Sequence, residues 1–249
     1  MKYSFKSRIR YSETDEHTRL TFPAMMDYFQ DTSTFHGEDN GLPLTMLYSK
    51  NLAWVLSGWQ VRIFKTVGLN DIATFTTWAY SFRGSIGLRN YTLTDESGTL
   101  CALADTQYVL MDIEKQLPER IPQFLADGYT IEPDSHMDTH MSRKIRIIIE
   151  EEALEPVPVR EYMIDTNNHV NNSQYIKTAI SLIPNDLKFN CFRAEYKMQA
   201  RLGNTLYPYR SFLDNGVQIK FYNETHELYF IAEWTYDHSQ SGDDYAAGR

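Results

Sequence analysis

The densest group of reactive side chains in the sequence is the run DTNNHVNN at residues 165–172, directly before a predicted helix. Asp and Asn at a helix start often only accept hydrogen bonds from its free backbone N–H groups. One or two residues suffice for that role, but this run offers a carboxylate, an imidazole and several amides, among them Asp165, Asn167, His169, Asn171 and Asn172. A helix N-terminus also stabilises an oxyanion. The run therefore predicts a site that activates water and polarises a carbonyl group.

Two predicted helices would position such groups, one in each half of the chain. Residues 171–183 have apolar side chains at helical spacing and end before Pro184, and residues 22–36 form an apolar stretch opened by Pro23. Strand-like runs follow each helix, and a further strand is predicted at 144–149. One long helix followed by long antiparallel strands predicts an α+β fold, in which a sheet wraps around a helix.

The two halves of the chain match at an offset of 150 residues. Arg10 falls on Arg160 and Asp15 on Asp165, and in both halves a strand ends in Arg, an acidic residue follows five positions later and a helix comes next. A tandem duplication is therefore favoured. We expect two lobes related by an approximate twofold axis, each with its own sheet. One continuous sheet would count against this interpretation.

Composition and charge narrow the class of protein. The 249 residues are 42% hydrophobic, as in a globular protein, and lack the run of about 20 apolar residues that a membrane-spanning helix needs. The net charge of −9 argues against nucleic acid as a partner. The N-terminus has no apolar signal-peptide core, and Cys101 and Cys191 show no disulfide or zinc spacing, so we expect a cytoplasmic protein. His136 and His140 lie in a polar segment and are a weak metal signal.

Residues 164–176 (IDTNNHVNNSQYI) closely resemble the DxNxHVNNxxYI motif of plant and bacterial acyl-acyl-carrier-protein thioesterases. Looser matches in the first half follow in the family's order: Tyr28–His36, Gly41–Leu42, Trp54–Leu56, Gly68–Asp71, Thr77–Trp78 and Arg89–Tyr91. The resemblance implies a tandem (double) hotdog fold, in which each repeat is a long helix wrapped by an antiparallel sheet. It also implies release of fatty acid from acyl carrier protein, with no metal and no organic cofactor. By the same resemblance, Asp165, Asn167 and His169 carry the chemistry.

The predicted division of the chain follows from this resemblance and from the composition. We expect an N-terminal hotdog repeat at 1–129 that holds the acyl chain, a polar linker at 130–142, a C-terminal repeat with the catalytic motif at 143–238, and a tail at 239–249.

The first repeat is expected to bind rather than react. Asp15, Glu16, His17 and Arg19 stand in the place of the motif but lack its Asn-rich sequence, so we interpret them as a degenerate site. Candidates for the substrate-binding wall are Met25, Met26, Phe29 and Trp54, together with Asn171 and Asn172 beside the motif. Apolar residues of these types more often form plain core.

One departure from the family changes the expected mechanism. Where the plant enzymes have a catalytic Glu followed by Cys, this chain has Gln199 and Ala200. An amide does not take a proton at neutral pH, so Gln199 can only hold a water by hydrogen bonds. Asp165 is then the best candidate for the base or nucleophile. Glu195, on the same face of the predicted strand as Gln199, is an alternative base, although an ion pair with a neighbouring cation is its more common role.

The expected partner is acyl carrier protein. Docking would use local cations despite the negative net charge: Arg143, Lys144 and Arg146 first, then Arg193 and Arg201. A homodimer is possible. Three other functions stay open, namely an acyl-coenzyme A thioesterase of hotdog type, a hotdog hydratase, whose usual motif differs, and a non-catalytic acyl-binding protein, which is compatible with the departures at Gln199 and Ala200.

Overall fold

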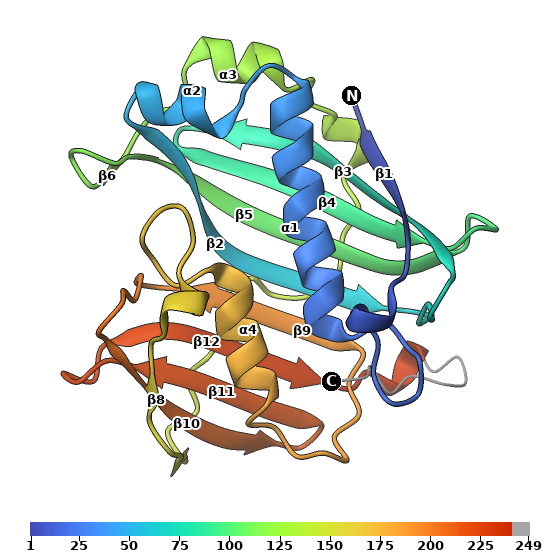
Figure 1. Cartoon of the computed structure of the whole chain (residues 1–249), viewed down its shortest axis with the longest axis vertical. Coiled ribbons are helices and arrows are strands. Elements are labelled where there is room, and N and C mark those ends of the chain that lie inside the picture. The colour runs from blue at the N-terminus through green and yellow to red at the C-terminus, as the bar shows by residue number, and fades with distance from the viewer. Residues whose placement is uncertain (241–249) are drawn as a thin grey trace.

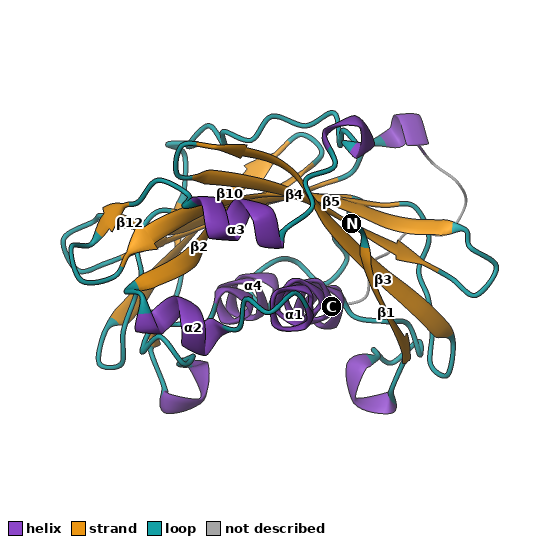
Figure 2. Ribbon diagram, turned by 90° about the horizontal axis from the view of Figure 1, so that it is seen from above, coloured by secondary structure: helices purple, strands orange, loops and turns teal. Residues whose placement is uncertain are grey.

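The computed structural model describes residues 1–240 of the protein. Two helices, α1 (Phe22–Asp39) and α4 (Asn172–Ile180), lie side by side on one face of a curved antiparallel sheet (Figures 1 and 2). The α+β class and the two predicted helices are thus confirmed. Most of the predicted tail, 241–249, lies outside the described residues.

The remaining elements complete the two repeats. The first repeat contains β1 (Tyr3–Arg8), α2 (Leu44–Ser49), β2 (Leu52–Ile63), β3 (Ile72–Arg83), β4 (Ile86–Thr94), β5 (Leu100–Asp112), β6 (Leu117–Pro118) and α3 (Gln123–Gly128). The second contains β7 (Glu152–Ala153), β8 (Val157–Pro158), β9 (Cys191–Tyr196), β10 (Thr205–Leu213), β11 (Gly216–Tyr222) and β12 (Leu228–Thr235). Short 3-10 turns lie at Tyr11–Glu13, Pro133–Ser135, Glu161–Met163 and His238–Gln240.

The start of α1 is set by local chemistry. The Thr21 side chain accepts a hydrogen bond from the Ala24 N–H at 3.4 Å, and Pro23 occupies the first turn, where its missing N–H costs nothing. The helix buries Phe29, which is fully inaccessible and packs on the rings of Trp59 and Tyr91. Aromatic packing of this kind adds stability beyond the area that it buries, so α1 is fixed to the concave face of the sheet.

The expectation of two separate sheets is wrong. The strands form one sheet in the order β1-β3-β4-β5-β2-β9-β12-β11-β10-β7, because β2 of the first repeat pairs antiparallel with β9 of the second. Gly58 lies at this junction, beside a register shift in β2, and a Cβ on it would come within 2.9 Å of the Ala194 carbonyl oxygen. A continuous sheet therefore does not count against duplication, since two hotdog sheets can join at their edges.

The loops that lead into α1 and α4 have the same backbone structure, 150 residues apart. Each follows a 3-10 turn and closes with an isolated antiparallel bridge, Thr14 to Leu20 in the first repeat and Ile164 to Val170 in the second. Thr18 and Asn168 both take a left-handed conformation, with φ of 59° and 60°. The offset of 150 found in the sequence thus recurs in backbone geometry.

A segment that we call the strap, residues 132–148, crosses the convex face of the sheet, opposite the helices. Its backbone carbonyls accept hydrogen bonds from side chains of five strands. In the first repeat, Trp78 of β3 donates to Ser135 (3.0 Å), Asn90 of β4 to Met137 (3.0 Å), Arg62 of β2 to Thr139 and Gln60 of β2 to Met141. In the second repeat, Arg193 of β9 donates to Ser142 (3.0 Å) and Gln218 of β11 to Arg146 (2.9 Å). The strand predicted at 144–149 is absent, because these side chains bind the backbone in place of a neighbouring strand.

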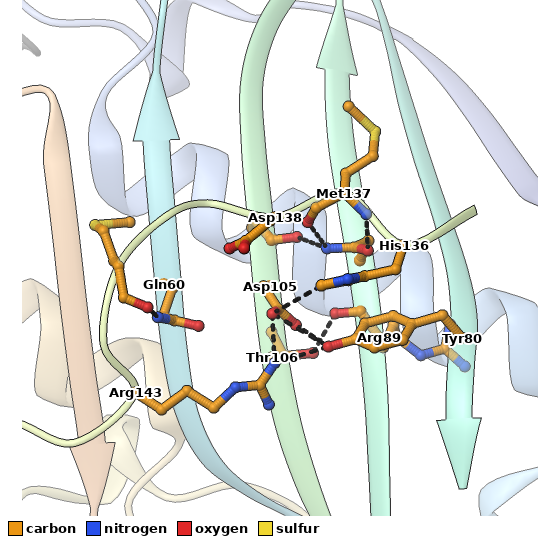
Figure 3. Close-up of polar contacts among 12 residues, drawn as sticks. Gln60, Tyr80, Arg89, Asp105, Thr106, His136, Met137, Asp138 and Arg143 are labelled. Atoms are coloured by element: carbon orange, nitrogen blue, oxygen red, sulfur yellow. Dashed lines mark hydrogen bonds and ion pairs between the residues drawn. The ribbon is translucent and has the colours of Figure 1, made fainter. Parts of the chain in front are cut away.

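A buried carboxylate of β5 also contacts side chains of the strap (Figure 3). The Asp105 carboxylate, 3% exposed, accepts hydrogen bonds from Tyr80 (2.9 Å) and Arg143, and lies 3.7 Å from the His136 ring. Burial raises the pKa of Asp105, and the positive charge of Arg143 opposes that shift. A polar segment between the repeats is therefore bound along its length to buried side chains.

Replacing Asn90 with Leu tests the strap. The buried Asn90 amide binds both the N–H (2.9 Å) and the carbonyl of Met137, and Leu would leave both groups unsatisfied in the interior. We expect Asn90→Leu to lower the free energy of unfolding by about 2–4 kcal/mol in urea denaturation. The exposed Asn215, which binds the Tyr236 carbonyl, is the control, and Asn215→Leu should cost under about 1 kcal/mol. Equal losses would show that the strap is not anchored through Asn90.

Candidate active site

A cavity of about 1190 Å³, including its open mouth, lies where the two repeats meet. The second repeat contributes part of the motif: Asp165, Thr166, Asn167, Asn171 and Asn172. The opposite wall comes from the first repeat: Gln30, Ser33, Thr34 and Gly37 of α1, Leu44, Leu47 and Tyr48 of α2, Ala53, Trp54 and Leu56 of β2, Ala79, Phe82, Gly87, Leu88 and Arg89 of β3 and β4, and Leu42, Tyr108 and Tyr129. Of the predicted catalytic residues, Asp165 and Asn167 thus face a space that the first repeat largely encloses.

The Asp165 side chain is held by the loop that it closes. Its Oδ1 accepts hydrogen bonds from the backbone N–H groups of Asn167 at 2.7 Å and His169 at 3.4 Å. The backbone N–H of Asp165 donates to the His169 carbonyl at 2.8 Å. The other oxygen, Oδ2, lies 3.5 Å from the Asn167 amide nitrogen. One carboxylate oxygen therefore fixes the loop, and the second accepts only the long contact from the Asn167 amide.

Asn167 receives a contact from the first repeat. The Tyr48 hydroxyl of α2 donates to Asn167 Oδ1 at 2.8 Å, which joins residues 119 positions apart. Sequence reasoning missed Tyr48, because no local pattern connects it to the motif.

His169 is turned toward Arg201 and is not among the cavity-lining residues. Its Nε2 accepts a hydrogen bond from Arg201 Nε at 3.1 Å, so its proton is on Nδ1, which is buried and has no partner in the described chain. Burial lowers the pKa of His169, the Arg201 charge lowers it further, and Asp165 opposes both. His169 is therefore neutral, and its backbone, not its ring, forms hydrogen bonds with Asp165.

Gln199 is exposed and lies outside the cavity wall. The strand expected to run through Ala200 ends at Tyr196, so the prediction that Glu195 and Gln199 share a strand face is wrong. Glu195 forms an ion pair with Lys197 and accepts the N–H of Ile145, which is the ordinary role expected for it. Ala200 supports the motif through its backbone, since its carbonyl accepts the Val170 N–H at 2.8 Å.

The predicted substrate-binding residues divide into two groups. Trp54, Asn171 and Asn172 line the cavity, and Asn171 also caps α4 by accepting the Ser173 N–H at 2.9 Å. Met25, Met26 and Phe29 are buried in the core and are not among the lining residues. Their place does not support a role in an acyl tunnel, because the side of α1 that reaches the cavity carries Gln30, Ser33 and Thr34 instead.

The fold and the motif have counterparts among known proteins. Residues 1–129 match the family model of the acyl-ACP thioesterase N-terminal domain, and residues 148–205 match that of the C-terminal domain. The chain belongs to the acyl-ACP thioesterase family.

Members of this family that resemble the chain include two plant proteins. The oleoyl-acyl carrier protein thioesterase 1, chloroplastic, of Arabidopsis thaliana is 23% identical over 207 residues, which are 75% of this chain and 56% of that protein. The palmitoyl-acyl carrier protein thioesterase, chloroplastic, of the same plant is 26% identical over 193 residues, 71% of this chain and 46% of that one. The chain spans about half the length of the curated relatives that it matches.

Solved structures share the tandem hotdog fold. An acyl-ACP thioesterase from Bacteroides thetaiotaomicron gives a TM-score of 0.83 at 18% identity, covering 95% of this chain and 98% of that one. The 12:0-ACP thioesterase from Umbellularia californica gives 0.82 at 16% identity, covering 94% and 96%. Within residues 1–240, no helix is long and apolar enough to cross a membrane, and no group of three or more His, Cys, Asp or Glu side chains is arranged to hold a metal ion.

A buried arginine, Arg89, lines the first-repeat wall of the cavity. Arg89 is 8% exposed, and its Nη1 contacts His36 Nδ1 at 3.0 Å and Thr77 Oγ1 at 3.1 Å. Its guanidinium lies 5.3 Å from the Tyr129 ring centroid. Within the described residues no carboxylate forms an ion pair with Arg89, so its charge is balanced only by neutral acceptors and the ring. The sequence singled out Arg89 only as part of the match at Arg89–Tyr91, which gives it no role.

The same arginine keeps His36 neutral. Burial and the Arg89 charge lower the pKa of His36 to about 3, so Nδ1 stays free to accept from Arg89. In the unfolded chain the imidazole takes a proton below about pH 6.5. The unfolded state therefore binds more protons than the folded state between about pH 6.5 and 3, and stability falls as the pH falls through that window.

His36→Asn tests this coupling, because the Asn carbonyl oxygen lies close to the place of Nδ1 and does not titrate. Between pH 7.5 and 5.5 the free energy of unfolding of the wild type should fall by about 1.4 kcal/mol more than that of the variant. Urea denaturation at each pH measures the difference. Parallel profiles for the wild type and His36→Asn would mean that His36 is protonated in the folded protein.

Proposed function

We propose that the protein hydrolyses fatty acyl-acyl carrier protein thioesters and releases free fatty acid. The observation that carries the proposal is the position of Asp165 and Asn167 on the wall of the cavity between the repeats, in a member of the acyl-ACP thioesterase family. A carboxylate with one weakly bonded oxygen beside a fixed amide donor is what attack of water on a thioester requires. In this proposal, repeat 1–129 holds the acyl chain, 130–142 links the repeats, and 143–238 carries the chemistry.

Asp165 acts as the general base in the proposed reaction. Its Oδ2 takes a proton from water as the water oxygen attacks the thioester carbonyl carbon. The Asn167 amide and the start of α4 stabilise the oxyanion of the tetrahedral intermediate. The intermediate then expels the thiolate of the carrier, which takes the proton from Asp165, and leaves the fatty acid. Direct attack by Asp165 on the thioester is the alternative form of the same assignment.

His169 and Gln199 take supporting roles. His169 holds Asp165 through two backbone hydrogen bonds and is itself oriented by Arg201. Gln199 would reach a water at most, because it is exposed and lies outside the cavity wall. Gln199 and Ala200 stand where the family has Glu and Cys, so Asp165 is the proposed base. The oxyanion donors are unaffected by these two differences.

Acyl carrier protein is the proposed partner, and not every predicted cation is available to bind it. Arg143 is paired with the buried Asp105 on the convex face, and Arg193 is paired with Glu233. Arg201 is exposed and contacts the motif loop through His169, which makes it the first candidate for docking. The proposal also includes a cytoplasmic location and a possible homodimer.

Two alternative functions differ from the proposed hydrolysis of acyl-acyl carrier protein. An acyl-coenzyme A thioesterase would use the same site with a different carrier. A non-catalytic acyl-binding protein would use the cavity alone, and the departures at Gln199 and Ala200 are compatible with it. The Asp165 carboxylate at the wall favours hydrolysis, because a site that only binds an acyl chain gains nothing from an anion beside the thioester carbonyl.

The duplication supplies a matched test of Asp165. Asp15 closes the equivalent loop of the first repeat, where its Oδ1 accepts the N–H groups of His17 and Arg19, both at 2.9 Å, but it is not a cavity residue. Asp165→Asn should lower kcat by about 10²-fold or more, since Asn still closes the loop but is not a base. Asp15→Asn should keep wild-type kcat. Similar kcat values for the two variants, with unchanged stability, would remove Asp165 from the mechanism.

A further inference from the structure

The contact between Tyr48 and Asn167 is the one hydrogen bond, among those of the described residues, by which a first-repeat side chain reaches the motif side chains. Tyr48 is half-buried, lines the cavity and donates to Asn167 Oδ1 at 2.8 Å. Its hydroxyl has no other hydrogen-bond partner in the described chain. The bond therefore serves Asn167 and not the internal structure of α2.

The helix that carries Tyr48 is anchored independently of that bond. Leu47, the next residue, is 2% exposed and packs in a cluster of the first repeat with Leu42, Leu52 and Leu125. The Leu44 N–H at the start of the helix donates to Glu38 at 3.1 Å. Tyr48 thus projects from a fixed support toward a loop of the other repeat.

Two neighbours together determine which way the Asn167 amide faces. The Asp165 carboxylate only accepts hydrogen bonds, so it favours the NH2 group on its side, where the nitrogen lies 3.5 Å from Oδ2. The Tyr48 hydroxyl supplies a donor on the other side, at the carbonyl oxygen. With its oxygen occupied, the amide presents N–H groups toward the Asp165 side of the cavity. A hydrogen bond to the oxygen also polarises the amide and strengthens its N–H as a donor.

We infer that Tyr48 is a positioning residue for thioester hydrolysis, which locks the Asn167 side chain so that its N–H faces the oxyanion. This inference rests on the proposed function. The site is then completed by a side chain of the first repeat. In this inference Tyr48 acts through Asn167 and not on the reacting atoms.

A double-mutant cycle on kcat tests the inference with acyl-acyl carrier protein as substrate. Tyr48→Phe keeps the ring and removes only the hydroxyl, so it should lower kcat about 3–10-fold while KM and thermal stability stay at wild-type values. In an Asn167→Ala background, Tyr48→Phe should have no further effect on kcat, because the group that it positions is gone. The exposed Tyr162 is the control, and Tyr162→Phe should leave kcat unchanged.

Each outcome decides between the two claims. An active wild type with full kcat in Tyr48→Phe overturns the inference and leaves the proposed function standing. Equal effects of Tyr48→Phe in the wild-type and Asn167→Ala backgrounds also overturn it, because the hydroxyl would then act independently of Asn167. A change confined to KM would place Tyr48 in substrate binding instead. A wild type that releases no fatty acid overturns the proposed function and this inference with it.

Discussion

The backbone pairing of β2 with β9 determines where the other parts of the molecule lie. It joins two hotdog sheets at their edges into one antiparallel sheet, and Gly58 permits the close approach of the Ala194 carbonyl at that junction. Because the sheets are continuous, α1 and α4 come side by side on the concave face. The cavity then opens between the repeats, where neither repeat alone would enclose it. Edge pairing also removes two exposed strand edges, which are sites of unwanted association.

The convex face shows a second consequence of the same junction. A sheet that spans two repeats needs its outer face covered, and the strap covers it with backbone in place of apolar side chains. Buried polar residues in the strands, such as Asn90, Gln60 and Gln218, are there because each one binds the strap. Hydrogen bonds along the strap offset the desolvation cost of burying those polar groups. The strap thereby couples the first repeat to the second on the face opposite the helices.

Much of the fold was predictable because its signals are local or periodic. The two helices, most long strands and the loop 165–172 follow from spacing, capping and turn chemistry, and the offset of 150 indicated the repeat. The strand predicted at 144–149 was wrong because alternation in the sequence does not tell whether a segment pairs with a strand or with side chains. The roles of Tyr48 and Arg89 could not be predicted either, because their partners are distant in the sequence. Tyr48 binds Asn167, 119 positions away, and Arg89 binds His36, 53 positions away. Met25, Met26 and Phe29 were placed at the cavity because composition does not say which face of α1 points inward to the core.

The central claim is that the cavity between the repeats hydrolyses a thioester held on acyl carrier protein. The most direct measurement is the release of thiol and of free fatty acid by the purified protein, from the same acyl chain carried on acyl carrier protein and on coenzyme A. We predict multiple turnovers, equal amounts of thiol and fatty acid, and a higher kcat/KM for the carrier-protein substrate. Tight binding of acyl-acyl carrier protein without turnover would contradict the claim and identify the protein as an acyl-binding one.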